Sequence, residues 1–207
     1  MINTVYGLVP IAKVFENRCN VQILANAAVY EAVQLREAGV QCDIVIIGGI
    51  PQHLIPAAVQ YRLQIPLFEK ITAKAANDAA ERAGVKQKVH IKIETGMNRL
   101  GVKPGRALSE LLSLVDGMKN IEIVGAYTHF ATSTADYNDA FALEQYEIFR
   151  QGVEQIKDRG VQLKYVHCCN SAAIAWFKEA YGTHVRSCSS VLGHMAMEDG
   201  REPIGLC

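Results

Sequence analysis

The chain has 207 residues, of which 50% are hydrophobic, and its 21 basic residues balance its 21 acidic ones. Such a chain can bury one substantial core, and its zero net charge gives no field that would recruit nucleic acid or an anionic membrane. No stretch approaches about 18 continuous apolar residues and the start lacks a basic segment followed by an apolar run, so we expect a cytoplasmic protein.

Seven apolar runs suited to buried parallel strands alternate with helical patterns along the sequence. They lie at residues 21–25, 43–47, 64–68, 89–93, 121–128, 164–169 and 184–187. Since no linker, charge run or short repeat interrupts this alternation, residues 1–207 are predicted to form a single α/β domain.

Helix ends can be read between several of these runs. Asn26 can cap a helix that Gly39 closes, and Pro104 can open another that ends before Gly117. The longest helix is expected to begin near Asn138. Its apolar stripe, which we interpret as core packing without a ligand, is Phe141, Gln145 or Tyr146, Phe149, Val153 and Ile156.

The strand at residues 89–93 carries two different faces. Val89, Ile91 and Ile93 share one side, whereas His90, Lys92 and Glu94 share the other. In a β/α barrel the apolar side faces the helices and the polar side faces the lumen, where unpaired charge is costly, so the charges indicate a site. The alternative is an exposed antiparallel strand with a solvated polar face.

Six cysteines occur in the chain: Cys19, Cys42, Cys168, Cys169, Cys188 and Cys207. No CxxC pair and no histidine at zinc-finger spacing accompanies them, so no metal site is predicted. Cys168 and Cys169 are adjacent in a predicted strand and should point to opposite faces, as packing residues and not as a bridge.

Seven parallel strands suit either an open doubly wound sheet or an eight-stranded barrel that lacks one strand. No GxGxxG follows an early strand, so a dinucleotide fold has no support. Polar residues instead follow several strands or lie in the last one: His129, Asn170, Ser171 and Arg186. That distribution favours a TIM-like β/α barrel with about seven parallel strands.

Four stretches, in order, resemble the PLP-binding barrel domain of alanine racemases, which use pyridoxal 5'-phosphate (PLP) to interconvert L- and D-alanine. The decapeptide Lys92-Ile93-Glu94-Thr95-Gly96-Met97-Asn98-Arg99-Leu100-Gly101 carries the specific part of this resemblance. The others are residues 30–39, the segment Thr128-His129-Phe130-Ala131 followed by Ala135-Asp136, and the segment from His167 to Ala173. The match as a whole covers almost the entire chain.

The resemblance implies a set of cofactor-binding residues. Arg99 would bond the phenolic oxygen of PLP, and Lys92, a position that some members carry as a carbamate, would lie beside it. His129 would lie against the cofactor ring and bond Arg186. Arg186 would donate to the pyridine nitrogen. For Lys92 the alternative is a plain salt bridge to Glu94 or another acid. Ser171 and backbone amides near residues 188 and 189 would bind the phosphate. The complete implied set is Arg99, His129, Asn170, Ser171, Arg186, Ser189 and Tyr6, supported by Lys92 and Met97.

The chain also departs from the family pattern. The family's first strand ends in a lysine that forms the Schiff base. If Tyr6-Gly7 is the family's Tyr-Gly, Ile2 occupies that position; if Gly7 is the family's final glycine, the position lies before Met1. Lys13 follows Gly7 on a helix that leads away from the site, so it does not substitute easily. Cys188 replaces a family glycine near the phosphate, which puts phosphate affinity in doubt. The β-rich second domain, with the tyrosine base, is expected to be absent.

The sequence is therefore interpreted as an alanine racemase-like barrel with both catalytic bases missing and impaired or no racemisation. PLP would bind without covalent attachment, alanine would be the small-molecule ligand, and the homodimer of the family would become an oligomer or aggregate because strand edges are left open. The alternatives are a barrel decarboxylase of basic amino acids, a non-catalytic single-domain PLP carrier, and a nonfunctional gene remnant.

Overall fold

The computed structural model describes residues 7–133, 139–188 and 190–192. The chain forms two compact units, residues 1–90 with 113–123 and residues 91–112 with 124–207. Among the described residues, no helix combines the length and the apolarity needed to span a bilayer.

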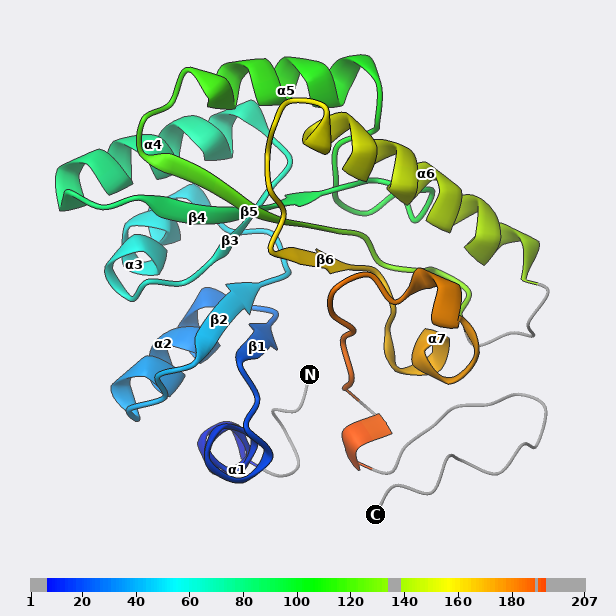
Figure 1. The fold of residues 1–207 in the computed structure, drawn as a ribbon. Helices are drawn as coiled ribbons and strands as arrows, with labels where there is room; N and C mark the ends of the chain where they lie inside the picture. The colour runs from blue at the N-terminus through cyan, green and yellow to red at the C-terminus, as the bar shows by residue number, and fades with distance from the viewer. Residues whose placement is uncertain (1–6, 134–138, 189, 193–207) are drawn as a thin grey trace. The chain divides into compact units, whose positions relative to one another are not determined.

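Helices and parallel strands alternate through the described chain (Figure 1). The strands are β1 (Ile23–Asn26), β2 (Asp43–Ile46), β3 (Ile65–Leu67), β4 (Gln87–Lys92), β5 (Ile121–Tyr127) and β6 (Tyr165–His167). The α-helices are α1 (Leu8–Cys19), α2 (Val29–Glu37), α3 (Ile55–Gln60), α4 (Lys70–Ala83), α5 (Arg106–Asp116), α6 (Ala140–Lys157) and α7 (Ser171–Trp176). Short 3-10 turns cover Gln52–Leu54, Lys178–Ala180 and Ser190–Leu192.

Each strand lies next to the strand that follows it in the chain. β1 and β2 form a two-stranded sheet, and β3, β4, β5 and β6 follow in order in a four-stranded sheet. The registered pairs are parallel, and a bridge between Val45 and Gln64 joins the end of β2 to the start of β3. Consecutive parallel strands joined by helices are the winding of a β/α barrel, whereas a doubly wound sheet reverses its strand order.

The strand containing Lys92 is buried on both faces. Val89, Ile91 and Ile93 are fully buried, but so is His90, and Lys92 is only 4% exposed. The alternative interpretation of residues 89–93, an exposed antiparallel strand with a solvated polar face, is therefore wrong.

The last predicted strand, residues 184–187, is extended but does not form a regular ladder. The backbone N–H groups of both Thr183 and His184 donate to the single carbonyl of Val166, and Arg186 N–H then donates to Cys169 O at 3.0 Å. Two residues share one ladder position, as in a bulge, so regular pairing with β6 is lost. Gly182, at φ +38°, lies against the Val166 carbonyl. A Cβ at this residue would come 2.3 Å from Val166 O, so the close approach requires glycine.

Two local predictions are wrong. Asn26 does not cap a helix, because it is the last residue of β1; Ala28 occupies the N-cap of α2, and Oδ1 of Asn26 has no partner among the described residues. Cys168 and Cys169 do not point to opposite faces. β6 ends at His167, so strand alternation no longer applies, and both thiols donate to the carbonyl of Ala180.

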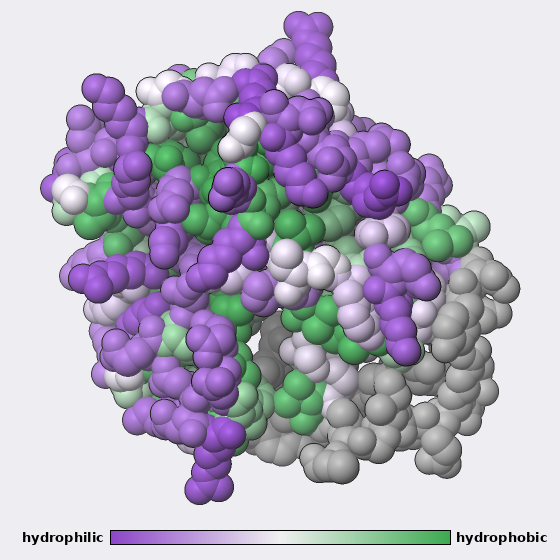
Figure 2. All heavy atoms as spheres, viewed as in Figure 1, coloured by the Kyte–Doolittle hydropathy of each residue, from purple (hydrophilic) through white to green (hydrophobic). Residues whose placement is uncertain are grey.

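The long helix α6 packs one stripe into the core of its unit. Gln145, Phe149, Val153 and Ile156 are buried as predicted. Phe141 is 37% exposed, since it lies in the first turn of the helix. Gly152 allows a close approach, because a Cβ there would lie 2.6 Å from Cδ1 of Ile93. Figure 2 shows hydrophilic residues over much of the outer surface in view.

Candidate functional site

A tight loop after β4 carries Arg99. Oε1 of Glu94 accepts hydrogen bonds from the N–H groups of Gly96 at 2.6 Å and Asn98 at 3.0 Å. Gly101 has φ +137°, and a Cβ at this residue would lie 2.7 Å from Glu94 N, so the loop can close only with glycine here. One oxygen of the nearby carboxylate is thus occupied by loop amides, while the Arg99 side chain stays exposed.

Lys92 is a buried amine without an acidic partner. Its Nζ lies 5.3 Å from the centre of the Tyr127 ring, and among the described residues it makes no ion pair, so the salt bridge to Glu94 that the sequence left open is not formed. Burial, followed by the charges of Arg99 and Arg186, lowers the pKa of Lys92 to about 8. A minor fraction, about a tenth at pH 7, is therefore an uncharged amine.

The guanidinium of Arg186 is held by five acceptors. Nη1 donates to the carbonyl and Nδ1 of His167 at 2.9 and 2.8 Å. Nη2 donates to the carbonyls of Thr128 and Cys168 at 2.8 and 3.0 Å, with Nδ1 of His129 at 3.3 Å. Within the described part of the chain, Nε has no acceptor. Both ends of the fork are thus fixed and one N–H donor remains for a ligand.

Two histidines accept from this arginine. The predicted bond between His129 and Arg186 is confirmed, at 3.3 Å. Burial and then the charge of Arg186 lower the pKa of His129 to about 4, so its imidazole is neutral at pH 7. The His167 ring stacks on the Tyr127 ring at a centroid distance of 5.1 Å and an interplanar angle of 7°. Because each Nδ1 faces the guanidinium N–H groups, each accepts there.

The segment after β6 contains Asn170 and Ser171. Oδ1 of Asn170 caps α7 by accepting from Ala173 N at 3.1 Å and also accepts from Ser133 Oγ at 2.7 Å. Oγ of Ser171 accepts from the N–H groups of Cys188 at 2.9 Å and Ser190 at 3.4 Å. Both amide N–H groups are thus taken up by the Ser171 hydroxyl, which keeps its own proton to donate.

Buried polar side chains join these segments. Oε1 of Gln145 accepts from Ala131 N at 3.0 Å, and its Nε2 donates to Thr95 Oγ1 at 3.1 Å. Thr95 Oγ1 lies 2.9 Å from Thr128 Oγ1. Helix α6 therefore fixes both the loop with Arg99 and the segment with His129.

The structure brings most of the predicted residues into one unit. Arg99, Lys92, His129 and Arg186 lie close enough for their charges to act on one another. Met97 is half-buried in the Arg99 loop. Tyr6 and Ser189 lie outside the described residues.

Sequence reasoning missed three contributors. Tyr127 packs beneath both Lys92 and Arg186, whose Cζ lies 5.9 Å from the ring centre. From the sequence, His167 was noted only as part of a family-like segment, and Gln145 only as a core position of the long helix; neither was predicted to hold the site. The available signal was a polar or aromatic residue at the end of a buried run, which points to a site only when its neighbours are known.

The site is a cation cluster with little compensating acid. Three positive side chains, Lys92, Arg99 and Arg186, act on one another, and Glu94 is the acid that opposes them at Lys92. Such a cluster favours an anionic ligand. The Nε–H of Arg186 and the Ser171 hydroxyl are two donors that such a ligand could use.

Comparison with known proteins gives one family. The model of the alanine racemase N-terminal domain matches residues 4–195. Alanine racemase 1 of Oceanobacillus iheyensis is 34% identical over 190 residues, which are 91% of this chain and 50% of that protein. The chain therefore spans about half the length of the curated relatives it matches.

Solved alanine racemases have the same fold. The enzyme of Clostridium difficile 630 in complex with cycloserine superposes with a TM-score of 0.84 at 26% identity, over 97% of this chain and 53% of that one. The Bacillus anthracis enzyme with bound L-Ala-P gives a TM-score of 0.80 at 30% identity, over 88% and 46% of the two chains. The predicted fold, an incomplete barrel of the alanine racemase type, is confirmed.

Proposed function

Because the chain belongs to the alanine racemase N-terminal domain family, we propose that the unit containing Arg99 and Arg186 is a PLP site from a racemase that interconverts L- and D-alanine. The observation that carries this proposal is the state of Arg186. Five acceptors fix both Nη atoms while Nε is left without one among the described residues. A donor fixed in this way suits the pyridine nitrogen of the cofactor.

Each remaining residue has a role that follows from its contacts. Arg99, exposed beside Lys92, would meet the phenolic oxygen, and the neutral His129 would lie against the ring without adding charge. Ser171 would donate its hydroxyl proton to the phosphate, and the amides of Cys188 and Ser190, which donate to Ser171 in the structure, would turn to the phosphate when it binds. Asn170, as the cap of α7, would position Ser171. When bound, PLP supplies the electron sink that weakens the Cα–H bond of an amino acid.

Arg186 would also set the kind of chemistry. A guanidinium keeps its protons, so it donates to the ring nitrogen without protonating it, and the ring stays a moderate electron sink. This favours simple proton exchange at Cα. Lys92 complements it: as an amine of lowered pKa, it can take up CO2 to become a carbamate anion that orients Arg99.

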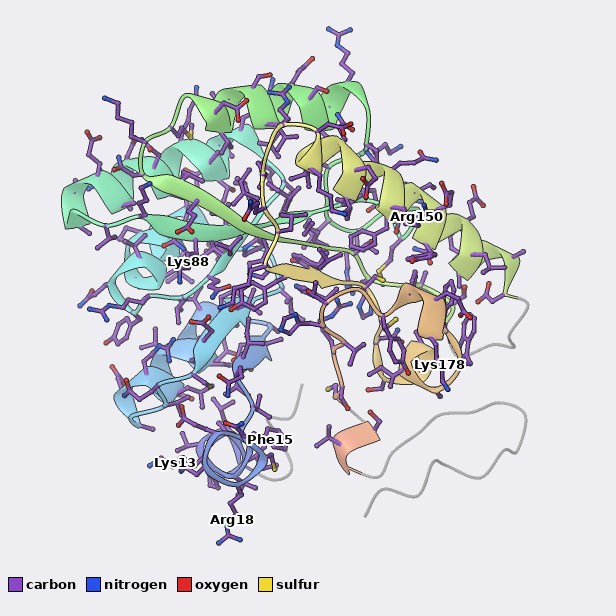
Figure 3. The ribbon with its side chains drawn as sticks, in the orientation of Figure 1. Lys13, Phe15, Arg18, Lys88, Arg150 and Lys178 are labelled. Carbon is purple, nitrogen blue, oxygen red and sulfur yellow. The ribbon has the colours of Figure 1, made fainter. Side chains whose placement is uncertain are left out.

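We further propose that racemisation by the 207 residues is impaired. Two groups must move a proton on opposite faces of Cα, and each general acid or base contributes roughly 10² to 10⁴ in rate. If Tyr6-Gly7 is the family's Tyr-Gly, Ile2 occupies the lysine position, and the alternative alignment supplies no lysine within the 207 residues either. Lys13 is exposed on α1 (Figure 3). PLP would then bind through non-covalent contacts, and a homodimer, as expected for the family, would not restore the lysine.

Binding of PLP tests the first part. Titration followed by quenching of Trp176, the single tryptophan, should saturate. Arg186→Leu should weaken binding about 10- to 100-fold, which is what a charge-assisted hydrogen bond contributes. The matched control is Arg150→Leu on α6, since Arg150 is exposed and pairs only with Glu147 among the described residues (Figure 3). Equal affinity in the two variants would contradict the proposal.

Racemisation tests the second part. With L-alanine and PLP, production of D-alanine should equal that of free PLP at the same concentration. Turnover well above this control would show that another group has taken the lysine's role, and Lys92→Met and Lys13→Met would identify it. Saturable PLP binding without turnover would leave the non-catalytic carrier as the better description, whereas the absence of binding would favour the gene remnant.

A further inference from the structure

Two adjacent thiols meet in the core behind Arg186. Cys168 and Cys169 are both fully buried. Their Sγ atoms lie 3.0 and 3.3 Å from the same acceptor, the carbonyl of Ala180, and the two thiols also contact each other. The side chains therefore converge on one point, although the residues are neighbours in sequence.

The backbone of the same two residues holds Arg186. The carbonyl of Cys168 accepts from Nη2 of Arg186, and the carbonyl of Cys169 accepts from its backbone N–H, both at 3.0 Å. A change in the Cys168–Cys169 peptide therefore acts directly on the arginine side chain, and through Cys169 on the neighbouring peptide that holds the Arg186 backbone N–H.

We propose that Cys168 and Cys169 are an oxidisable dithiol pair, which a peroxide converts into a vicinal disulfide that loosens Arg186. In the first step the thiolate of Cys169 attacks one peroxide oxygen, the O–O bond breaks, and Cys169 becomes a sulfenic acid while hydroxide leaves. In the second step the sulfur of Cys168 attacks the sulfur of Cys169, the S–O bond breaks and water leaves. Two thiols lose two electrons and two protons, and hydrogen peroxide is reduced to two waters.

The surroundings of the pair favour this order of events. A hydrogen bond from the Cys168 thiol, and the positive charge of Arg186, lower the pKa of Cys169, whereas the same bond and burial raise the pKa of Cys168. The proposed order makes Cys169 the nucleophile and Cys168 the resolving thiol, and both lie on the same carbonyl. A small neutral peroxide can reach buried thiols that larger reagents cannot.

The disulfide cannot form without moving the backbone. Adjacent Cα atoms across a trans peptide are about 3.8 Å apart, whereas disulfides usually join Cα atoms separated by about 4.4 to 6.8 Å. The peptide must rotate to relieve this strain, and its rotation turns the carbonyl of Cys168 away from Arg186. A strained disulfide is also easily reduced, so the change is reversible.

Peptide mass after native treatment with hydrogen peroxide tests the modification. The tryptic peptide Tyr165–Lys178 contains both thiols and no other cysteine, so it should lose about 2 Da and regain it with dithiothreitol. Cys168→Ser should stop at a sulfenic acid on Cys169, which dimedone traps when the oxidised protein is unfolded in its presence. Cys42→Ser, in the other unit, should leave the loss unchanged. Addition of oxygen without the 2 Da loss, or loss only after unfolding in urea, would overturn the proposal.

Hydrogen exchange tests the effect on Arg186 and needs no cofactor, so it is independent of PLP binding. The Arg186 amide should exchange about two- to tenfold faster after oxidation, the range expected for losing one hydrogen bond. The amide of Ile93, which donates to Tyr127 O at 2.8 Å, is the internal control and should not change. A disulfide that leaves exchange at Arg186 unaltered would refute the coupling.

Discussion

Replacing Gln145 by leucine should destabilise the unit that contains the site. The side chain is fully buried on α6, accepts from Ala131 N and donates to Thr95 Oγ1. Leucine is similar in size but has no polar atom, so Ala131 N–H loses its acceptor, which costs about 1–3 kcal/mol. Thr95 keeps Thr128 as a partner, so its loss is about 0.5–1 kcal/mol.

The sum is a loss of about 2–4 kcal/mol in the free energy of unfolding. In urea, with a slope of about 2–3 kcal/mol per molar, the midpoint should fall by about 1 M. Trp176 reports this transition, because it is buried, stacks on Phe177 and donates to Ser133 O.

The matched control is Gln151→Leu, which makes the same chemical change at an exposed position of the same helix. It should change the free energy of unfolding by no more than about 0.5 kcal/mol. If both variants shift equally, or neither does, the assigned role of the Gln145 hydrogen bonds is wrong.

Three further predictions follow from the site and the strand edges. The folded pKa of His129, about 4, lies below its unfolded value of about 6.5. Neutral His129 should therefore stabilise the fold fully above pH 6.5, and this contribution, on the order of 1–3 kcal/mol, should be lost as pH falls towards 4. The urea midpoint of His129→Gln should depend less on pH across that window than the midpoint of the wild type, and equal slopes would refute the assignment. With ¹³C-bicarbonate at pH 8 a carbamate ¹³C resonance should appear, should vanish in Lys92→Arg and should persist in Lys74→Arg, because the lowered pKa of Lys92 leaves free amine to react. Light scattering at micromolar concentration should show self-association, since β1 has β2 as its only strand neighbour among the described residues and an open edge recruits other chains; a monodisperse monomer would contradict this.

The sequence predicted β1 to β6 and the loop after β4 because their signals are local, whereas the seventh predicted strand, residues 184–187, is not a regular strand. Apolar runs of five or six residues predicted β2 and β4 within one or two positions, since a strand buried on both faces needs continuous apolar residues. The loop could be predicted because residues 94–101 contain their own fixing groups, the Glu94 carboxylate and Gly101. The resemblance to alanine racemases also rests on this loop.

Tertiary structure alone decided how the site is held. Gln145 reaches Thr95 across 50 residues of sequence, and Arg186 collects acceptors from the ends of two strands, so no local pattern carries either contact. The convergence of Cys168 and Cys169 was also hidden, because strand alternation stops where β6 ends, and only the path of the following chain brings Ala180 O between the two thiols. Local residue patterns fix where strands and turns occur, whereas hydrogen bonds between distant residues depend on how the whole backbone folds.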